Sequence, residues 1–277
     1  MAKRKSLQEL TIVDDFMFGA VMQEPKRCKI LLEMVLGVKI KKIIYPQLQK
    51  TIDKLYDSKS IRLDVYVEDG KGTVYNVEMQ TTMVKSLPKR MRYYQGLIDL
   101  NILDKGKNYD ALKKSFVIFF CTYDPFGEGR YVYTFENRCL QNLKLAFGDE
   151  ATKIVLNTKG TVGEISEDLK SLLHFMDGME PESKYARELE NVVESIKKSE
   201  EWRREYMVML ERRLDDRKIG KWANKVSIVR RKRGDYPIDV LADITDTKPE
   251  DIYTMMDLID KHPDWEDDEI ADDILFC

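Results

Sequence analysis

Two runs of alternating apolar and polar residues, joined by a glycine-rich segment, constrain the fold of this chain more than any other feature. The runs cover residues 62–68 and 74–80 and are rich in β-branched and aromatic side chains, which is typical of half-buried strands. The Gly-Lys-Gly segment at residues 70–72 can supply the left-handed residue that a tight turn requires. The pattern therefore predicts a β-hairpin in which Asp69 pairs with Thr73.

The predicted register places acidic side chains of the two strands opposite each other. Asp64 lies across from Glu78, and Arg62 lies across from Gln80. Opposed residues have Cβ atoms about 4.5–5.5 Å apart, so two carboxylates repel unless a cation lies between them. A ligand set made only of oxygen atoms suits Mg²⁺ or Mn²⁺. The alternative is an exposed polar sheet face on which opposed acids carry only a small penalty.

The spacing of Asp64 and residues 78–80 (Glu-Met-Gln) resembles the D…E-x-K core of the PD-(D/E)XK nucleases, in an E-x-Q variant. Three further blocks resemble, in the same order, the family of recombination-promoting nucleases or putative transposases: residues 15–18, 87–96 and 116–127. The resemblance covers residues 8–165. It implies an α/β fold with a restriction-endonuclease-like mixed β-sheet flanked by helices.

The resemblance also implies the residues of an active site. Asp64 and Glu78 would bind Mg²⁺ or Mn²⁺, with the main-chain carbonyl oxygen of Met79 as a third ligand, and Asp64, Glu78 and Gln80 would be the catalytic residues. Gln80 takes the position of the lysine that orients the attacking water and adds positive charge in the superfamily. An amide can hold a water molecule by hydrogen bonds, but it contributes no charge.

The missing positive charge must then come from another residue, and Arg62 and Arg92 are the candidates. The resemblance adds three accessory positions, which are Asp15, Tyr94 and Gln95. From the residues alone, Asp15 is expected to cap a short helix, and the side chains at positions 94 and 95 are expected in a core or an interface.

A net charge of −3 gives the chain no overall attraction to nucleic acid, so a DNA-binding surface must be local. One basic stretch surrounds the start of a predicted helix, and it contains the candidate DNA contacts Lys85, Lys89, Arg90 and Arg92. Cations at a helix N-terminus oppose the macrodipole and do not stabilise the helix. They form either a solvated basic face or a set of phosphate contacts. DNA is the partner that the resemblance implies.

Periodicity and helix-end signals predict the remaining elements of this region. Helices are expected at residues 14–21, 25–36 and 88–103, and strands at 38–45, 115–122, 131–135 and 153–156. The third helix carries an apolar stripe, formed by Met91, Tyr94, Ile98 and Ile102. Polar residues 50–59 are expected to form a mobile loop that approaches the active site.

The pattern is entirely helical beyond Ser166, and we expect a nuclease domain at residues 1–177 followed by a helical region at residues 178–277. A long amphipathic helix at residues 184–217, interrupted near Gly220, could pack on the nuclease domain or pair with a second chain. A homo-oligomer formed through this helical tail is therefore left open.

The tail also predicts two short helices within residues 237–258. Thr247 and Glu250, in the turn between them, have the spacing of a capping box. The second helix is acidic, which is unlike an element that reads the major groove of DNA.

Composition excludes several other kinds of site. Two histidines disfavour histidine-based hydrolysis, and four scattered cysteines fit reduced thiols better than a disulfide framework or a zinc site. No apolar run is long enough to span a bilayer, and no signal peptide is indicated, so we expect a cytoplasmic protein. The expected function is a metal-dependent DNA endonuclease linked to recombination or mobile elements. The alternative is a weakly active or inactive nuclease-fold module that binds DNA or oligomerises.

Overall fold

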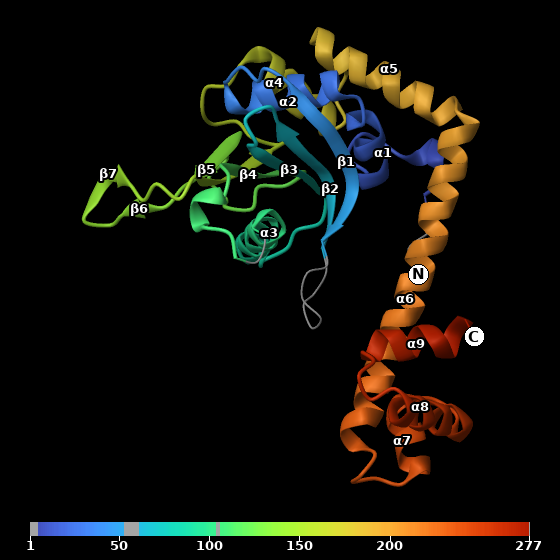
Figure 1. The fold of residues 1–277 in the computed structure, drawn as a ribbon. Helices are drawn as coiled ribbons and strands as arrows, with labels where there is room; N and C mark the ends of the chain where they lie inside the picture. Colours follow the sequence, from blue (N-terminus) through green and yellow to red (C-terminus); the bar gives the residue numbers. More distant parts are fainter. Residues whose placement is uncertain (1–4, 53–60, 104–105, 277) are drawn as a thin grey trace. The chain divides into compact units, whose positions relative to one another are not determined.

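The computed structural model describes residues 5–52, 61–103 and 106–276, and its contacts divide the chain into two compact units at Ser199 (Figure 1). The first unit contains the β-sheet, and the second is helical. Helix α5 (Lys184–Lys198) lies with the sheet unit because it contacts α1 and α4. The nuclease domain boundary at residue 177 stays a prediction.

A six-stranded mixed sheet forms the centre of the first unit, in agreement with the predicted α/β fold. Its strand order is β1 (Ile43–Ile52), β2 (Ile61–Asp69), β3 (Val74–Gln80), β4 (Ser115–Cys121), β8 (Ala151–Asn157) and β5 (Val132–Phe135). The pairs β1–β2, β2–β3 and β5–β8 are antiparallel, whereas β3, β4 and β8 run parallel. Strand β3 is therefore the junction between the hairpin and the parallel part of the sheet.

The hairpin of β2 and β3 has the predicted register. Val65 pairs with Val77, and the N–H of Asp69 donates to the carbonyl oxygen of Thr73 at 3.0 Å. Gly72 has a φ of +81°, so a glycine does supply the left-handed residue of the turn. This register fixes which side chains of the two strands share a face, because side chains alternate along a strand.

Helices cover both faces of the sheet (Figure 1). Helix α3 (Leu87–Ile102) packs on one face, where its predicted stripe is buried at Met91, Tyr94 and Ile98. The other face is covered by α1 (Asp15–Met22), whose Phe18 ring lies 6.1 Å from that of Phe120. The remaining helices of the first unit are α2 (Pro25–Leu36) and α4 (Glu167–Met176), with short 3₁₀ turns at Leu7–Glu9 and Tyr109–Ala111.

The first strand differs from the prediction for residues 38–45. Strand β1 begins at Ile43 and continues to Ile52, into the segment expected to form a loop. Residues 53–60 of that segment lie outside the described residues. Polar residues and Pro46 are tolerated here because β1 is an edge strand, and the pairing register shifts between Ile44 and Gln47. The small hairpin of β6 (Arg138–Cys139) and β7 (Asn142–Ala146) was not predicted.

The second unit consists of four helices. They are α6 (Glu200–Lys232), α7 (Ile238–Thr245), α8 (Pro249–Lys261) and α9 (Asp267–Phe276), packed around a core that includes Val229, Leu241 and Ile252. The helix interruption predicted near Gly220 is wrong, because the break occurs at Ser199, whose backbone is extended. A single glycine inside a long helix costs only about 1 kcal/mol.

Two details of the tail also differ from the prediction. The turn before α8 is closed by Asp251, whose carboxylate accepts from the N–H of Lys248 at 3.3 Å, rather than by Thr247 and Glu250. Helix α9 was not predicted. In the part of the chain that the structure describes, no helix combines the length and apolar character needed to cross a membrane.

Candidate functional site

Two carboxylates hold the neighbouring strands β2 and β3 together at the end of their hairpin. The N–H of Asp64 donates to Glu78 Oε1 at 3.1 Å, and the N–H of Met79 donates to Asp64 Oδ2 at 3.0 Å. Each carboxylate thus accepts a backbone hydrogen bond from the opposite strand. Glu78 is only 1% exposed, whereas Asp64 is half-buried. The structure brings the two predicted acids together on one face of the sheet.

The electrostatics of this pair favour a cation. Burial raises the pKa of the Glu78 carboxyl well above its ordinary value of 4.5, and the negative charge of Asp64 raises it further. The guanidinium of Arg90 lowers the same pKa but does not offset the other two effects. A divalent ion beside the pair would allow both groups to ionise.

The donor set is compatible with magnesium. Mg²⁺ typically binds one or two carboxylates and completes its shell with water and substrate phosphate. Among the described residues, no group of three or more histidine, cysteine or acidic side chains could hold a metal ion. Further ligands would therefore come from a carbonyl oxygen, such as that of Met79, from water or from phosphate. An all-protein cage is not what this ion requires.

Helix α3 brings a positive charge to the E-x-Q triplet through Arg90. One Arg90 Nη atom donates to Gln80 Oε1 at 2.6 Å, and the other lies 3.7 Å from Glu78 Oε2. The Nε and Nη2 atoms also donate to the Tyr94 hydroxyl, at 2.9 and 2.6 Å. The guanidinium carbon lies 5.6 Å from the centre of the Phe119 ring. The guanidinium of Arg90 thus contacts four side chains, which fix its position.

This placement adds Arg90 to the candidates for the missing cation, and the identity of that cation stays a prediction. Arg92 is exposed, and Arg90, which was expected only as a DNA contact, reaches Gln80 instead. Helix spacing contains the signal, since residues four apart share a face and Arg90 lies four before the buried Tyr94. Arg62 belongs to β2, but its side chain lies outside the described part of the structure.

The amide of Gln80 has a fixed orientation. Its Nε2 donates to the carbonyl oxygen of Thr82 at 2.7 Å, while its Oε1 accepts from Arg90. An amide has two N–H donors and two acceptor lone pairs, so one of each remains available for further hydrogen bonds. Gln80 is 7% exposed, which limits those bonds to small partners such as water.

The other accessory residues lie elsewhere. Asp15 is the first residue of α1, its carboxylate accepts from the N–H of Phe16, and the N-cap position belongs to Asp14, so the expected cap role is wrong. Helix α1 packs on the face opposite to Glu78. Gln95 donates to Ser115 Oγ at 2.7 Å, which links α3 to β4. Roles for Asp15 and Gln95 in catalysis stay predictions.

The basic residues around the start of α3 are solvent-accessible. Lys85, Lys89 and Arg92 are exposed, whereas Arg90 turns inward and is 36% exposed. The three exposed cations are accessible to a phosphate backbone, and their role in DNA binding stays a prediction.

Comparison with known proteins supports the family resemblance. A family model described as a PD-(D/E)XK nuclease family transposase matches residues 13–158. This span begins just before α1 and includes all six strands of the large sheet as well as α3. No curated protein and no solved structure shows a significant match.

Proposed function

Because the chain belongs to the PD-(D/E)XK nuclease family transposases, we propose that it is a metal-dependent endonuclease that hydrolyses phosphodiester bonds of DNA. The observation that carries this proposal is the reciprocal hydrogen bonding of Asp64 and Glu78, which brings a carboxylate of β2 and a carboxylate of β3 close together. A cytoplasmic location and a link to recombination or mobile elements belong to the same proposal.

Asp64, Glu78 and the carbonyl oxygen of Met79 would hold Mg²⁺ or Mn²⁺. When bound, such an ion supplies Lewis acidity and lowers the pKa of a coordinated water molecule. The protein positions both carboxylates through backbone hydrogen bonds, so the ligands are oriented before the ion arrives. Burial of Glu78 keeps bulk water from competing for its oxygen atoms.

Arg90 would supply the charge that Gln80 cannot. Gln80 and Tyr94 hold the guanidinium beside Glu78, where it can offset negative charge on a phosphate during cleavage. The remaining N–H and lone pair of the Gln80 amide can orient a water molecule. Lys85, Lys89 and Arg92, around the start of α3, would contact the DNA backbone.

The test is Mg²⁺-dependent nicking of supercoiled plasmid by the purified chain. We expect Asp64→Asn and Glu78→Gln each to lower the rate by at least two orders of magnitude. Glu68→Gln is the matched control, because it removes a carboxylate from the same face of β2 and should retain activity. Absence of metal-dependent cleavage in the wild type, or equal rates in all four proteins, would refute the proposal.

The second candidate function is a nuclease-fold module that binds DNA without cutting it. The observation that favours it is Gln80, since an amide stands where the superfamily has a charged lysine. Calorimetry separates the two candidates. Salt-sensitive DNA binding without Mg²⁺ or Mn²⁺ binding would support the module, because salt sensitivity reports phosphate contacts.

A further inference from the structure

The small hairpin of β6 and β7 carries an uncovered apolar face. Leu143 and Leu145 alternate with polar or small residues along the second strand, so they share one side of it, and Phe147 follows the end of that strand. They are 66, 57 and 76% exposed, respectively. Such alternation is typical of a strand with one buried face. In the described chain, every residue of β7 is exposed.

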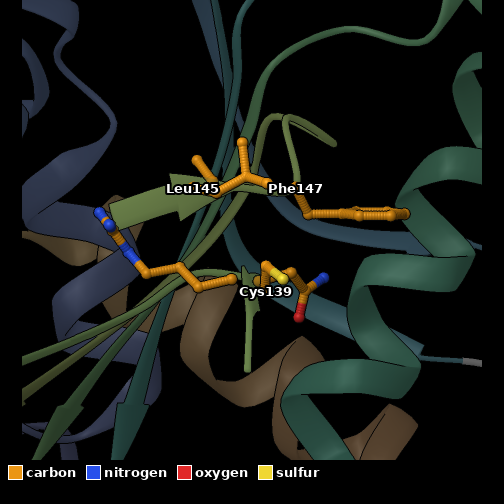
Figure 2. Close-up of a pocket in the computed structure, with 6 residues that line it drawn as sticks. Cys139, Leu145 and Phe147 are labelled. Atoms are coloured by element: carbon orange, nitrogen blue, oxygen red, sulfur yellow. The ribbon is translucent and has the colours of Figure 1, made fainter. Parts of the chain in front are cut away.

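Leu145 and Phe147 also line a shallow hollow that an apolar side chain could enter. Figure 2 shows Leu145, Phe147 and Cys139 around this hollow, which has a volume of about 570 Å³. Cys139 contributes a half-buried thiol from β6. The hairpin thus offers both protruding apolar groups and a depression beside them.

The charge of the segment does not favour nucleic acid as the occupant. Residues 136–150 contain three acidic and two basic side chains, and Arg138 is paired with Glu136. A polyanion requires local positive charge, which this surface lacks. The occupant should therefore present an apolar protein surface.

We propose that this face is the interface with a second copy of the chain, with the two hairpins packed face to face about a two-fold axis. A two-fold contact uses the same patch on both subunits, so the protruding groups of each copy can fill the hollow of the other. An isolated two-stranded ribbon is marginally stable in water, and this packing stabilises it.

The exposed apolar area of residues 135–147, which include the end of β5 and the turn of the hairpin, reaches the lower limit for such a contact if all of it is buried. Five large apolar side chains of this region are exposed: Phe135, Leu140, Leu143, Leu145 and Phe147. Together they present on the order of 500 Å² per chain. Two copies would bury roughly 1,000 Å², which is near the lower limit for a specific interface.

The experiment measures the oligomeric state of the full chain by sedimentation velocity at micromolar concentration. We expect a dimer, and we expect Leu143→Lys/Leu145→Lys to raise its dissociation constant at least tenfold. Both side chains are exposed in the single chain, so the variant should keep its circular dichroism spectrum. Tyr253→Lys is the control, because it places a lysine on an exposed apolar site of α8 and should remain dimeric.

A short bismaleimide supplies a second readout. Cross-linking through Cys139 should trap the wild-type dimer, and Cys139→Ser should lower the yield. A monomeric wild type would overturn the proposal. So would a dimer that persists in the double-lysine variant or one that Tyr253→Lys dissociates, because either result places the contact elsewhere. None of these outcomes depends on nuclease activity, so this proposal can fail while the proposed function stands.

Discussion

Replacing Arg90 by glutamine tests whether the cation of the site comes from α3. The guanidinium bridges Gln80 and Glu78, the two ends of the E-x-Q triplet. Glutamine keeps a hydrogen-bonding group of similar length but removes the charge. We expect the variant to fold, to bind DNA, and to cleave it more slowly.

The structure sets the size of the effect. Two unit charges 3.7 Å apart, the distance from Arg90 to Glu78, interact by about 4.5 kcal/mol at an effective dielectric constant of 20. Arg90 is 36% exposed, so solvent screening reduces this value; about 2 kcal/mol is a reasonable remainder. In the Arg90→Gln variant, negative charge that develops beside Glu78 during cleavage would lose a comparable free energy of stabilisation. This corresponds to a roughly 30-fold lower kcat.

The assay is plasmid nicking under saturating DNA with Mg²⁺, accompanied by calorimetry with Mn²⁺. Arg92→Gln is the matched control, because it removes an exposed arginine two residues away on the same helix. Restoring the charge in the double variant Arg90→Gln/Gln80→Lys should recover at least a third of the wild-type kcat. A purely structural role for Arg90 predicts no rescue. Equal rates for Arg90→Gln and Arg92→Gln, in an active enzyme, would refute the reasoning.

Three further outcomes follow from the same strands. The stability of Glu78→Gln relative to the metal-free wild type should increase as pH rises above about 4.5. The raised pKa of Glu78 means that the native wild type binds more protons than its unfolded state, so the stability of the wild type falls with pH. Urea unfolding at several pH values measures the difference between the two proteins, and a constant difference would contradict the prediction. Asp69→Ala should cost about 2–3 kcal/mol at neutral pH, since this carboxylate accepts from two backbone N–H groups and the Tyr75 hydroxyl. Burial raises the pKa of Asp69, but its hydrogen bonds outweigh this effect and lower the pKa below the ordinary value of 3.8. The part of this contribution that depends on ionisation should therefore be lost in acid unfolding curves as pH falls through that lower pKa. Gly72→Ala should cost about 1–2 kcal/mol because of its positive φ, whereas Gly70→Ala, which has no such strain, should cost clearly less in the same urea titration.

The elements that local pattern determines were predictable, and the hairpin of β2 and β3 is the clearest example. Its alternation fixed the faces, and its glycine turn fixed the register, so the meeting of Asp64 and Glu78 followed from sequence. The stripe of α3 was equally readable, because it depends only on helical period.

Other features depend on contacts that local pattern does not contain. The extent of strand β1 is set by its pairing with β2, which includes polar residues. The strand therefore begins where this pairing begins and not where the apolar run in the sequence begins. Helical spacing places Arg90 on the same face as Tyr94, but the contact of Arg90 with Gln80 depends on where α3 lies on the sheet. The hairpin of β6 and β7 was missed for a different reason: its strands have only two and five residues, so the alternation is too short to stand out.

The site lies where the backbone N–H groups of β2 and β3 donate to side-chain carboxylates instead of to main-chain carbonyl oxygens. As far as Val65 and Val77 the strands form an ordinary antiparallel pair. Beyond this pair, the N–H groups of Asp64, one residue before Val65, and of Met79, two residues after Val77, donate to carboxylates. Buried backbone donors must be satisfied, so the same two acids that would bind an ion also complete the sheet. Each uses a single oxygen for this purpose, and a carboxylate can ligate an ion through one oxygen. The sheet can therefore hold both ligands in place without giving up its own hydrogen bonds when an ion binds.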